Sequence, residues 1–144
     1  MPAFRRIDGD GNDLDLIVNE IGNYTGTHPL DITDAQGALS ALQVVADGNW
    51  TIVVKVMQKA THFTGSASGK GSNVLLAAPD TITGLATATI THKGSSNFVV
   101  KAYTSDDSDL LVNEIGNYNG QVILPDGTLV FEIIADGTWS IKLG

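Results

Sequence analysis

Apolar and polar residues alternate with a period of two along two segments of the chain. The apolar positions are Trp50, Ile52, Val54 and Val56 in the first segment and Trp139, Ile141 and Leu143 in the second. Residues that alternate in this way point to opposite faces of a β-strand. The pattern therefore predicts two strands, each with a tryptophan on the side that faces the core.

An Asp-Gly pair precedes each of these strands, Asp47-Gly48 in one case and Asp136-Gly137 in the other. Each pair also follows an apolar run, which is typical of a β-hairpin, so two hairpins are expected. Further short runs predict strands over residues 73–78, 84–92, 97–103, 109–113 and 119–124. No segment shows a sustained helical period. We therefore expect an all-β chain that folds as an antiparallel β-sandwich similar to a jelly roll.

Two sequence motifs occur twice. DLIVNEIGNYTG at residues 15–26 returns as DLLVNEIGNYNG at 109–120, and ADGNWTI at 46–52 returns as ADGTWSI at 135–141. The first pair is offset by 94 residues and the second by 89. Because the difference falls between the two motifs, the sequence predicts a loop of variable length there.

The two copies of the repeat are unequal. Residues 62–144 form a complete repeat with about seven predicted strands, whereas residues 1–58 form a partial repeat with five. The counterparts of the strands at 73–78 and 84–92 are missing from the first copy. Either the copies merge into one twelve-stranded sandwich, or the first copy keeps an exposed sheet edge whose free backbone groups recruit other strands.

The charge of the chain narrows the choice of partners. Sixteen acidic and eight basic residues give a net charge of −8. Such a surface repels phosphate backbones and anionic lipids, which argues against nucleic acid and membrane as partners. The absence of cysteine excludes disulfides and thiolate metal sites. No hydrophobic signal core follows Met1, so no export signal is expected and the location stays open.

Three motifs, ITHKGSSNFVVKAY at 90–103, VNEIGNYxG and ADGxWxI, resemble a repeat of small secreted β-sandwich modules of actinobacterial type. Those modules have a THxGSSNFxV strand, an LLVNxIGxYxG strand and turn, and a closing ADGxWxI hairpin. The resemblance covers residues 62–144 in full and 4–57 in part. It implies a β-sandwich in a secreted, cell-surface context, and it implies no activity, because the function of these modules is largely unassigned.

Two acidic loops carry the oxygen ligands that calcium prefers. The candidate ligands are Asp8, Asp10, Asn12 and Asp13 in the first loop and Asp106, Asp107 and Asp109 in the second. The first loop departs from an EF-hand, because Asp13 stands where glycine is needed and Asn19 where the bidentate glutamate belongs. A solvated turn is the favoured interpretation and a weak calcium site is the alternative. No other cofactor is expected.

The sequence does not point to catalysis. The three histidines, His28, His62 and His92, form no HxH or HxxxH pair, and they are expected in loops and at strand ends. The Gly/Ser run at 64–72 has the wrong spacing for a phosphate-binding loop, and Ala67 stands where a nucleophile elbow needs serine. We therefore expect a protein that is not an enzyme.

The repeated motifs supply the remaining candidate residues. These are Asn19, Glu20, Gly22, Tyr24 and Trp50 in the first copy and Asn113, Glu114, Gly116, Tyr118 and Trp139 in the second. They are interpreted as structural, because the glycines allow positive φ and the tyrosines can fix a corner. Both tryptophans are expected in the core rather than as sugar-binding platforms, since each shares a face with isoleucine.

The expected function is that of a structural protein, an accessory or decoration subunit on the surface of a larger assembly such as a phage capsid or tail. A truncated repeat that lacks strands favours this role. The expected partner is a protein or a second copy of the chain, with contacts on residues 1–30 and on the threonine-rich strand at 84–92. The alternative is an extracellular carbohydrate- or calcium-dependent binding module, which the resemblance favours. A virion surface or an extracellular location follows from these two functions.

Overall fold

The computed structural model describes residues 3–30 and 39–144. The chain divides into two compact units, residues 1–54 (unit 1) and residues 55–144 (unit 2). Part of the predicted variable loop, at residues 31–38, lies outside the described residues.

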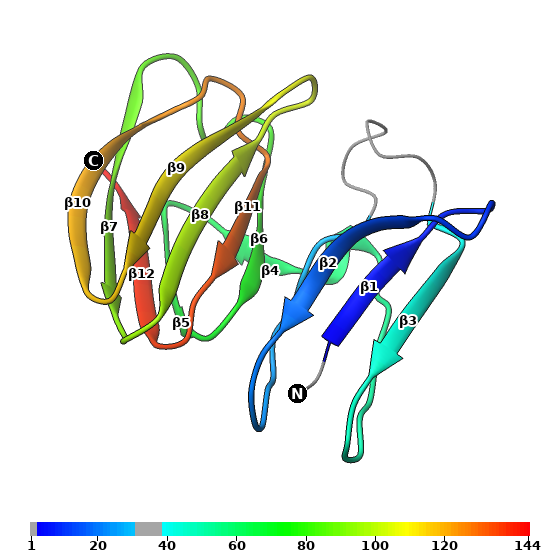
Figure 1. The fold of residues 1–144 in the computed structure, drawn as a ribbon. Coiled ribbons are helices and arrows are strands. Elements are labelled where there is room, and N and C mark those ends of the chain that lie inside the picture. The colour runs from blue at the N-terminus through cyan, green and yellow to red at the C-terminus, as the bar shows by residue number, and fades with distance from the viewer. Residues whose placement is uncertain (1–2, 31–38) are drawn as a thin grey trace. The chain divides into compact units, whose positions relative to one another are not determined.

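Unit 2 is a β-sandwich of two sheets (Figure 1). One sheet has the order β10-β7-β12-β5, with β5 at Ser66–Lys70, β7 at Ala86–Lys93, β10 at Tyr118–Leu124 and β12 at Thr138–Leu143. The other has the order β4-β6-β11-β8-β9, with β4 at Thr61–Phe63, β6 at Asn73–Ala77, β8 at Asn97–Tyr103, β9 at Ser108–Ile115 and β11 at Val130–Ile134. A short 3-10 helix at Met57–Lys59 precedes β4. The predicted all-β sandwich is confirmed.

The core of unit 2 lies between the inner faces of these sheets. Ile90 on β7 and Ile141 on β12 contribute from one sheet, and Phe98 on β8 and Phe131 on β11 contribute from the other. On β7 the apolar residues alternate with threonines, and Thr89 on the outer face is exposed, as the sequence predicts. Removal of this apolar surface from water is the main stabilising contribution to the sandwich.

The predicted hairpin at Asp136-Gly137 is wrong. The strands on either side of this turn, β11 and β12, lie in different sheets, so the turn carries the chain across the sandwich. The turn at Gly116, between β9 and β10, also changes sheet. An Asp-Gly pair reports a tight reversal of the chain, and the sequence signal is the same whether the next strand pairs with the previous one or faces it.

Unit 1 contains a three-stranded sheet of order β2-β1-β3, with β1 at Ala3–Ile7, β2 at Asp13–Asn19 and β3 at Ala41–Val45 (Figure 1). This order matches β9-β8-β11 of unit 2. Phe4 is opposite Val18 and Val44, as Val100 is opposite Val112 and Ile133. A register shift follows both Phe4 and Val100 at the same place in the ladder. Unit 1 therefore reproduces three strands of one sheet, with the same register as far as Arg6; a second shift between Arg6 and Ile7 has no counterpart in unit 2.

The second sheet of the sandwich has no counterpart among the described residues of unit 1. Residues 22–30 (the first arm) follow β2 and correspond to β10, and residues 46–54 (the second arm) follow β3 and correspond to β12; neither arm forms a strand. In unit 2 both β10 and β12 pair with β7, whereas no described strand of unit 1 pairs with either arm. The prediction of five strands in the first copy is thus corrected to three.

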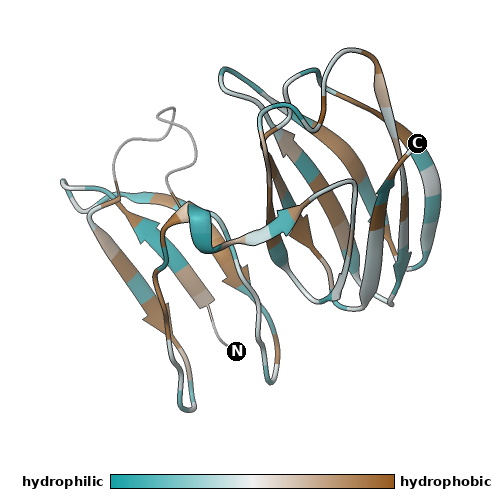
Figure 2. Cartoon of the chain, turned by 180° about the vertical axis from the view of Figure 1, so that it is seen from behind, coloured by the Kyte–Doolittle hydropathy of each residue, from teal (hydrophilic) through white to brown (hydrophobic). Residues whose placement is uncertain are grey.

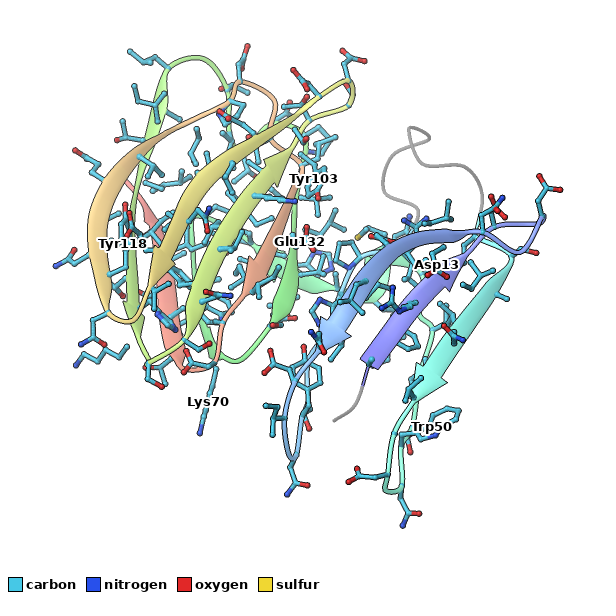
Figure 3. All side chains as sticks on the ribbon, in the orientation of Figure 1. Asp13, Trp50, Lys70, Tyr103, Tyr118 and Glu132 are labelled. Atoms are coloured by element: carbon cyan, nitrogen blue, oxygen red, sulfur yellow. The ribbon has the colours of Figure 1, made fainter. Side chains whose placement is uncertain are left out.

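The prediction that Trp50 lies in the core is also wrong. Trp139 is 3% exposed, whereas Trp50 is 60% exposed (Figure 3). The apolar run beside Trp50 is exposed as well, and Figure 2 shows it on the arm that leads into the 3-10 helix. Alternation reports which residues share a face, and a face becomes buried only where a second layer covers it.

Candidate interaction site

The repeated motifs of unit 2 meet at one end of its sandwich, where the Asp136 carboxylate joins two turns. Its Oδ2 atom accepts hydrogen bonds from the Ser95 amide at 2.9 Å, the Ser95 hydroxyl at 3.1 Å and the Ser96 amide at 3.1 Å. Partial burial is the largest influence and raises the pKa of Asp136, but these hydrogen bonds together lower the pKa below its usual value. Asp136 therefore acts as an ionised acceptor that fixes the turn between β7 and β8.

His92 lies at the centre of the same end and is fully buried. Its Nδ1 atom donates to the Gly116 carbonyl oxygen at 2.6 Å, and its Nε2 atom lies 3.3 Å from Oδ1 of Asp136. The imidazole stacks on the Phe98 ring with 4.3 Å between ring centroids. The Gly94 amide donates to the Asn117 side-chain oxygen at 3.2 Å. The motifs THKGSS, NEIGNY and ADGTW thus form one structural junction.

The histidines lie in a loop or near strand ends, as expected, but the sequence did not predict the burial of His92. It lies on β7 and shares the inner face with Ala88 and Ile90, and this parity was the sequence signal that could have placed it in the core. His62 is exposed on β4, where its Nε2 atom lies 3.3 Å from the Gln58 carbonyl oxygen. The structure does not bring these two histidines together.

A row of three large side chains crosses the β10-β7-β12 sheet. His92 is opposite Tyr118 on one side and opposite Trp139 on the other. The Trp139 indole donates from Nε1 to the Gly71 carbonyl oxygen at 2.9 Å, and its ring lies against Gly69 of β5. A Cβ at Gly69 would lie 2.7 Å from the indole, so only glycine permits this contact. Trp139 is buried because β5 and β7 both flank it.

Unit 1 keeps the motif residues of this junction without the strand that joins them. Gly22 has a φ of 88°, close to the 85° of its counterpart Gly116, so the first turn has the same left-handed conformation. Asp47, the counterpart of Asp136, is exposed. Tyr24 bonds to His28, and the two rings stack with 6.0 Å between centroids. Burial lowers the pKa of His28, so its imidazole favours the neutral form.

A groove of about 680 Å³ runs through unit 1, with the sheet as its floor and the two arms as its walls. Its apolar lining includes Phe4, Val18, Val44, Trp50 and Ile52. The strand residues on the floor are half-buried, whereas their counterparts Val100, Val112 and Ile133 in unit 2 are fully buried. The floor of the groove is thus less buried than the equivalent surface in unit 2.

The first acidic loop uses its carboxylates within the protein. The Asp8 side chain accepts from the amides of Asp10 at 2.9 Å and Asn12 at 2.8 Å, and it also accepts from the Asn12 side chain at 3.1 Å. The hydrogen bond from the Asn12 amide is the largest of the influences that lower the pKa of Asp8. Asp13 forms an ion pair with Arg5 at 3.3 Å. These contacts are those of a closed turn between β1 and β2.

The second acidic loop is also a turn. The Asp107 amide donates to the Thr104 hydroxyl at 3.1 Å, and the Asp107 side chain accepts from the Ser108 amide at 2.8 Å. Asp106 and Asp109 are exposed on either side. Over residues 3–30 and 39–144, no group of three or more acidic, histidine or cysteine side chains is placed to hold a metal ion.

The remaining predicted residues do not converge on a site. Asn19 ends β2 and Glu20 follows it, while Asn113 and Glu114 lie in β9, and all four side chains are exposed.

In the part of the chain that the structure describes, no helix is long and apolar enough to span a membrane. No protein-family model, curated protein or solved structure matches the chain. The resemblance to secreted β-sandwich modules therefore stays a prediction.

Proposed function

We propose that the chain is a non-enzymatic structural protein, an accessory or decoration subunit that attaches to the surface of a larger assembly such as a phage capsid or tail. The observation that carries this proposal is the uncovered inner face of the sheet in unit 1. A sandwich with one layer leaves apolar side chains in contact with water, and association with another polypeptide removes them from it.

The distribution of exposed apolar side chains supports an interaction role for unit 1. In the described part of unit 1, the large exposed apolar side chains are Leu16, Ile21, Val45, Trp50, Ile52, Val53 and Val54. Those of the longer unit 2 are Val56, Leu85, Leu110, Ile115 and Ile123. Four of these residues, Trp50, Ile52, Val53 and Val54, lie together on the second arm. Exposed apolar residues that gather on one part of a surface are typical of protein interaction sites.

The edge of the sheet in unit 1 supports the same role. In unit 2, β11 pairs with β8 on one side and with β6 on the other. Its counterpart β3 pairs with β1 alone among the described strands, so β3 is an edge strand. An edge strand with free backbone groups is a template for pairing with another chain.

Exposed Trp50 favours a second candidate function, an extracellular carbohydrate-binding module. An exposed indole in a groove is a stacking surface for a sugar ring. The second arm also brings Asp47 and Asn49 to the groove as polar partners. A calcium-dependent version of this function has less support, because the carboxylates of Asp8 and Asp13 are already bonded within the protein.

Fractionation of the organism that encodes the chain distinguishes these functions. Mass spectrometry would measure the amount of the chain in purified virions or other particles and in the soluble and secreted fractions. We expect the chain in the particles, at a fixed ratio to their major subunit, after high-salt washing. Recovery as a free secreted protein that is retained on immobilised polysaccharide would contradict this function and favour the carbohydrate-binding module.

A further inference from the structure

The groove of unit 1 occupies the place that β7 fills in the complete copy. In unit 2, β7 lies between β10 and β12, and its inner face packs on β8 through the stacked rings of His92 and Phe98. In unit 1, the counterparts of β10 and β12 are the two arms that form the walls of the groove. Its floor includes Phe4 and Val44, which stand where Val100 and Ile133 meet the core in unit 2. The walls and the floor of a β7 site are therefore present.

Unit 1 also keeps several of the residues that contact β7 and its turn in unit 2, whereas the position of Phe98 falls outside its described residues. The Gly116 carbonyl accepts from His92, and Gly22 has the same backbone conformation as Gly116. Asp136 accepts hydrogen bonds from the Gly-Ser-Ser turn, and its counterpart Asp47 is exposed on the second arm. Tyr118 and Trp139 flank His92 in the sheet, and their counterparts lie one on each arm.

We propose that this groove binds a β-strand with the pattern of residues 84–96, donated by another polypeptide chain. The proposal rests on the function proposed above and specifies the partner by its chemistry. The donor strand carries small or branched apolar residues at the positions of Ala88 and Ile90, histidine at the position of His92, and a Gly-Ser-Ser turn after it. Strand addition of this kind combines main-chain hydrogen bonds with pockets for alternate side chains.

A second copy of this chain is a poor donor. Its own β7 is an inner strand of the four-stranded sheet and pairs on both sides, so donation would open its own core. Two copies of unit 1 also repel each other, because residues 1–54 contain eight acidic and two basic residues. Residues 84–96 contain Lys93 and no acidic residue, so a donor with this pattern complements the charge of unit 1.

The test is binding of a synthetic peptide with the sequence of residues 84–96 to the full chain, measured by isothermal titration calorimetry and by tryptophan fluorescence. We expect one peptide per chain with a dissociation constant below about 100 μM, and a shift of the Trp50 emission to shorter wavelength. The shift is lost in Trp50→Phe, because Trp139 is already buried.

Matched variants separate strand insertion from unspecific adhesion. In the peptide, Ile90→Lys replaces an inward residue and should weaken binding at least about tenfold, whereas Thr89→Lys on the outer face should leave binding within about twofold. In the full chain, Val44→Lys on the floor of the groove should weaken peptide binding as much as Ile90→Lys in the peptide does. Gln43→Lys, on the opposite face of β3, is the matched control. The peptide variants keep the test valid if Val44→Lys unfolds unit 1.

Three results would overturn the proposal: no binding at about 100 μM peptide, equal binding of the Ile90→Lys and Thr89→Lys peptides, or a stable dimer of the chain through unit 1 that excludes the peptide. None of these results would contradict the proposed attachment to an assembly, because that attachment is tested separately by the fractionation experiment. Conversely, specific peptide binding by a chain that never copurifies with particles would support the donor strand and contradict the structural role.

Discussion

Trp50 and Trp139 occupy the same position of the same motif and have opposite environments. Trp139 lies between β5 and β7 with its indole bonded to Gly71, and it is 3% exposed. Trp50 follows an Asp-Gly turn of the same sequence and is 60% exposed. A strand sequence therefore folds as a strand only where its neighbours in the sheet are present.

The largest expected contrast between the two units is the effect of removing each tryptophan. Trp139→Ala should lower the free energy of unfolding of unit 2 by about 3–5 kcal/mol, because it leaves a cavity in the core. Trp50→Ala should change stability by less than about 0.5 kcal/mol, because its indole is mostly in water. Thermal denaturation followed by circular dichroism checks both values. Equal losses would show that the two positions are equally packed.

A smaller contrast is expected at the two aspartates. Asp136→Ala removes the acceptor for the amides of Ser95 and Ser96 and should lower the stability of unit 2 by about 1–2 kcal/mol. Asp47→Ala should leave the stability of unit 1 in the isolated chain unchanged. Urea denaturation of the two variants measures the difference. A loss in Asp47→Ala as large as that in Asp136→Ala would mean that the first copy is already complete.

The two units should also respond to acid in different pH windows. Burial lowers the pKa of His28, so the unfolded chain takes up the proton first and unit 1 loses stability as the pH falls below about 6.5. The pKa of Asp136 is below its usual value of 3.8, so its contribution to unit 2 is present above that pH and is lost below it. Amide signals followed by nuclear magnetic resonance across this range should show the two steps. His28→Gln should remove the first step, and a first step that persists in this variant would contradict the assignment.

Calcium should have the smallest effect. Both acidic loops are closed by hydrogen bonds within the protein, so millimolar calcium or EDTA should leave the melting temperature of both units unchanged. A calcium site exposed to a free calcium concentration one hundred times its dissociation constant would raise the free energy of unfolding by about 2.7 kcal/mol. A rise with calcium that is abolished by Asp10→Ala or by Asp107→Ala would identify a metal site in that loop.

Much of unit 2 could be predicted from the sequence, because the positions of its strands and their inner faces depend on residues that are close together in the chain. Alternation on β7 and β12 places Ile90 and Ile141 on inner faces, and the structure confirms both. The repeat also predicted that residues 1–58 contain no counterparts of the strands at 73–78 and 84–92. These features follow from periodicity and spacing, which do not depend on the partners of a strand.

The sequence could not predict which sheet each strand joins. The Asp136-Gly137 turn reads as a hairpin, yet it joins two sheets, because the pairing of β12 with β7 is a long-range contact. The junction of His92 with Asp136 was missed for the same reason. The burial of Trp50 was mispredicted because alternation carries no information on whether a second layer is present.

Backbone hydrogen exchange in the isolated chain, resolved by residue and measured at low concentration, tests most directly the claim that unit 1 is a single-layered sheet. Slow exchange is expected for the amides of residues 138–143, which are held by β7 and β5. Exchange close to that of an unstructured chain is expected for residues 49–54, which pair with no described strand. Equal protection of the two segments would contradict a single-layered sheet in unit 1, because the second arm would then already be paired within the chain.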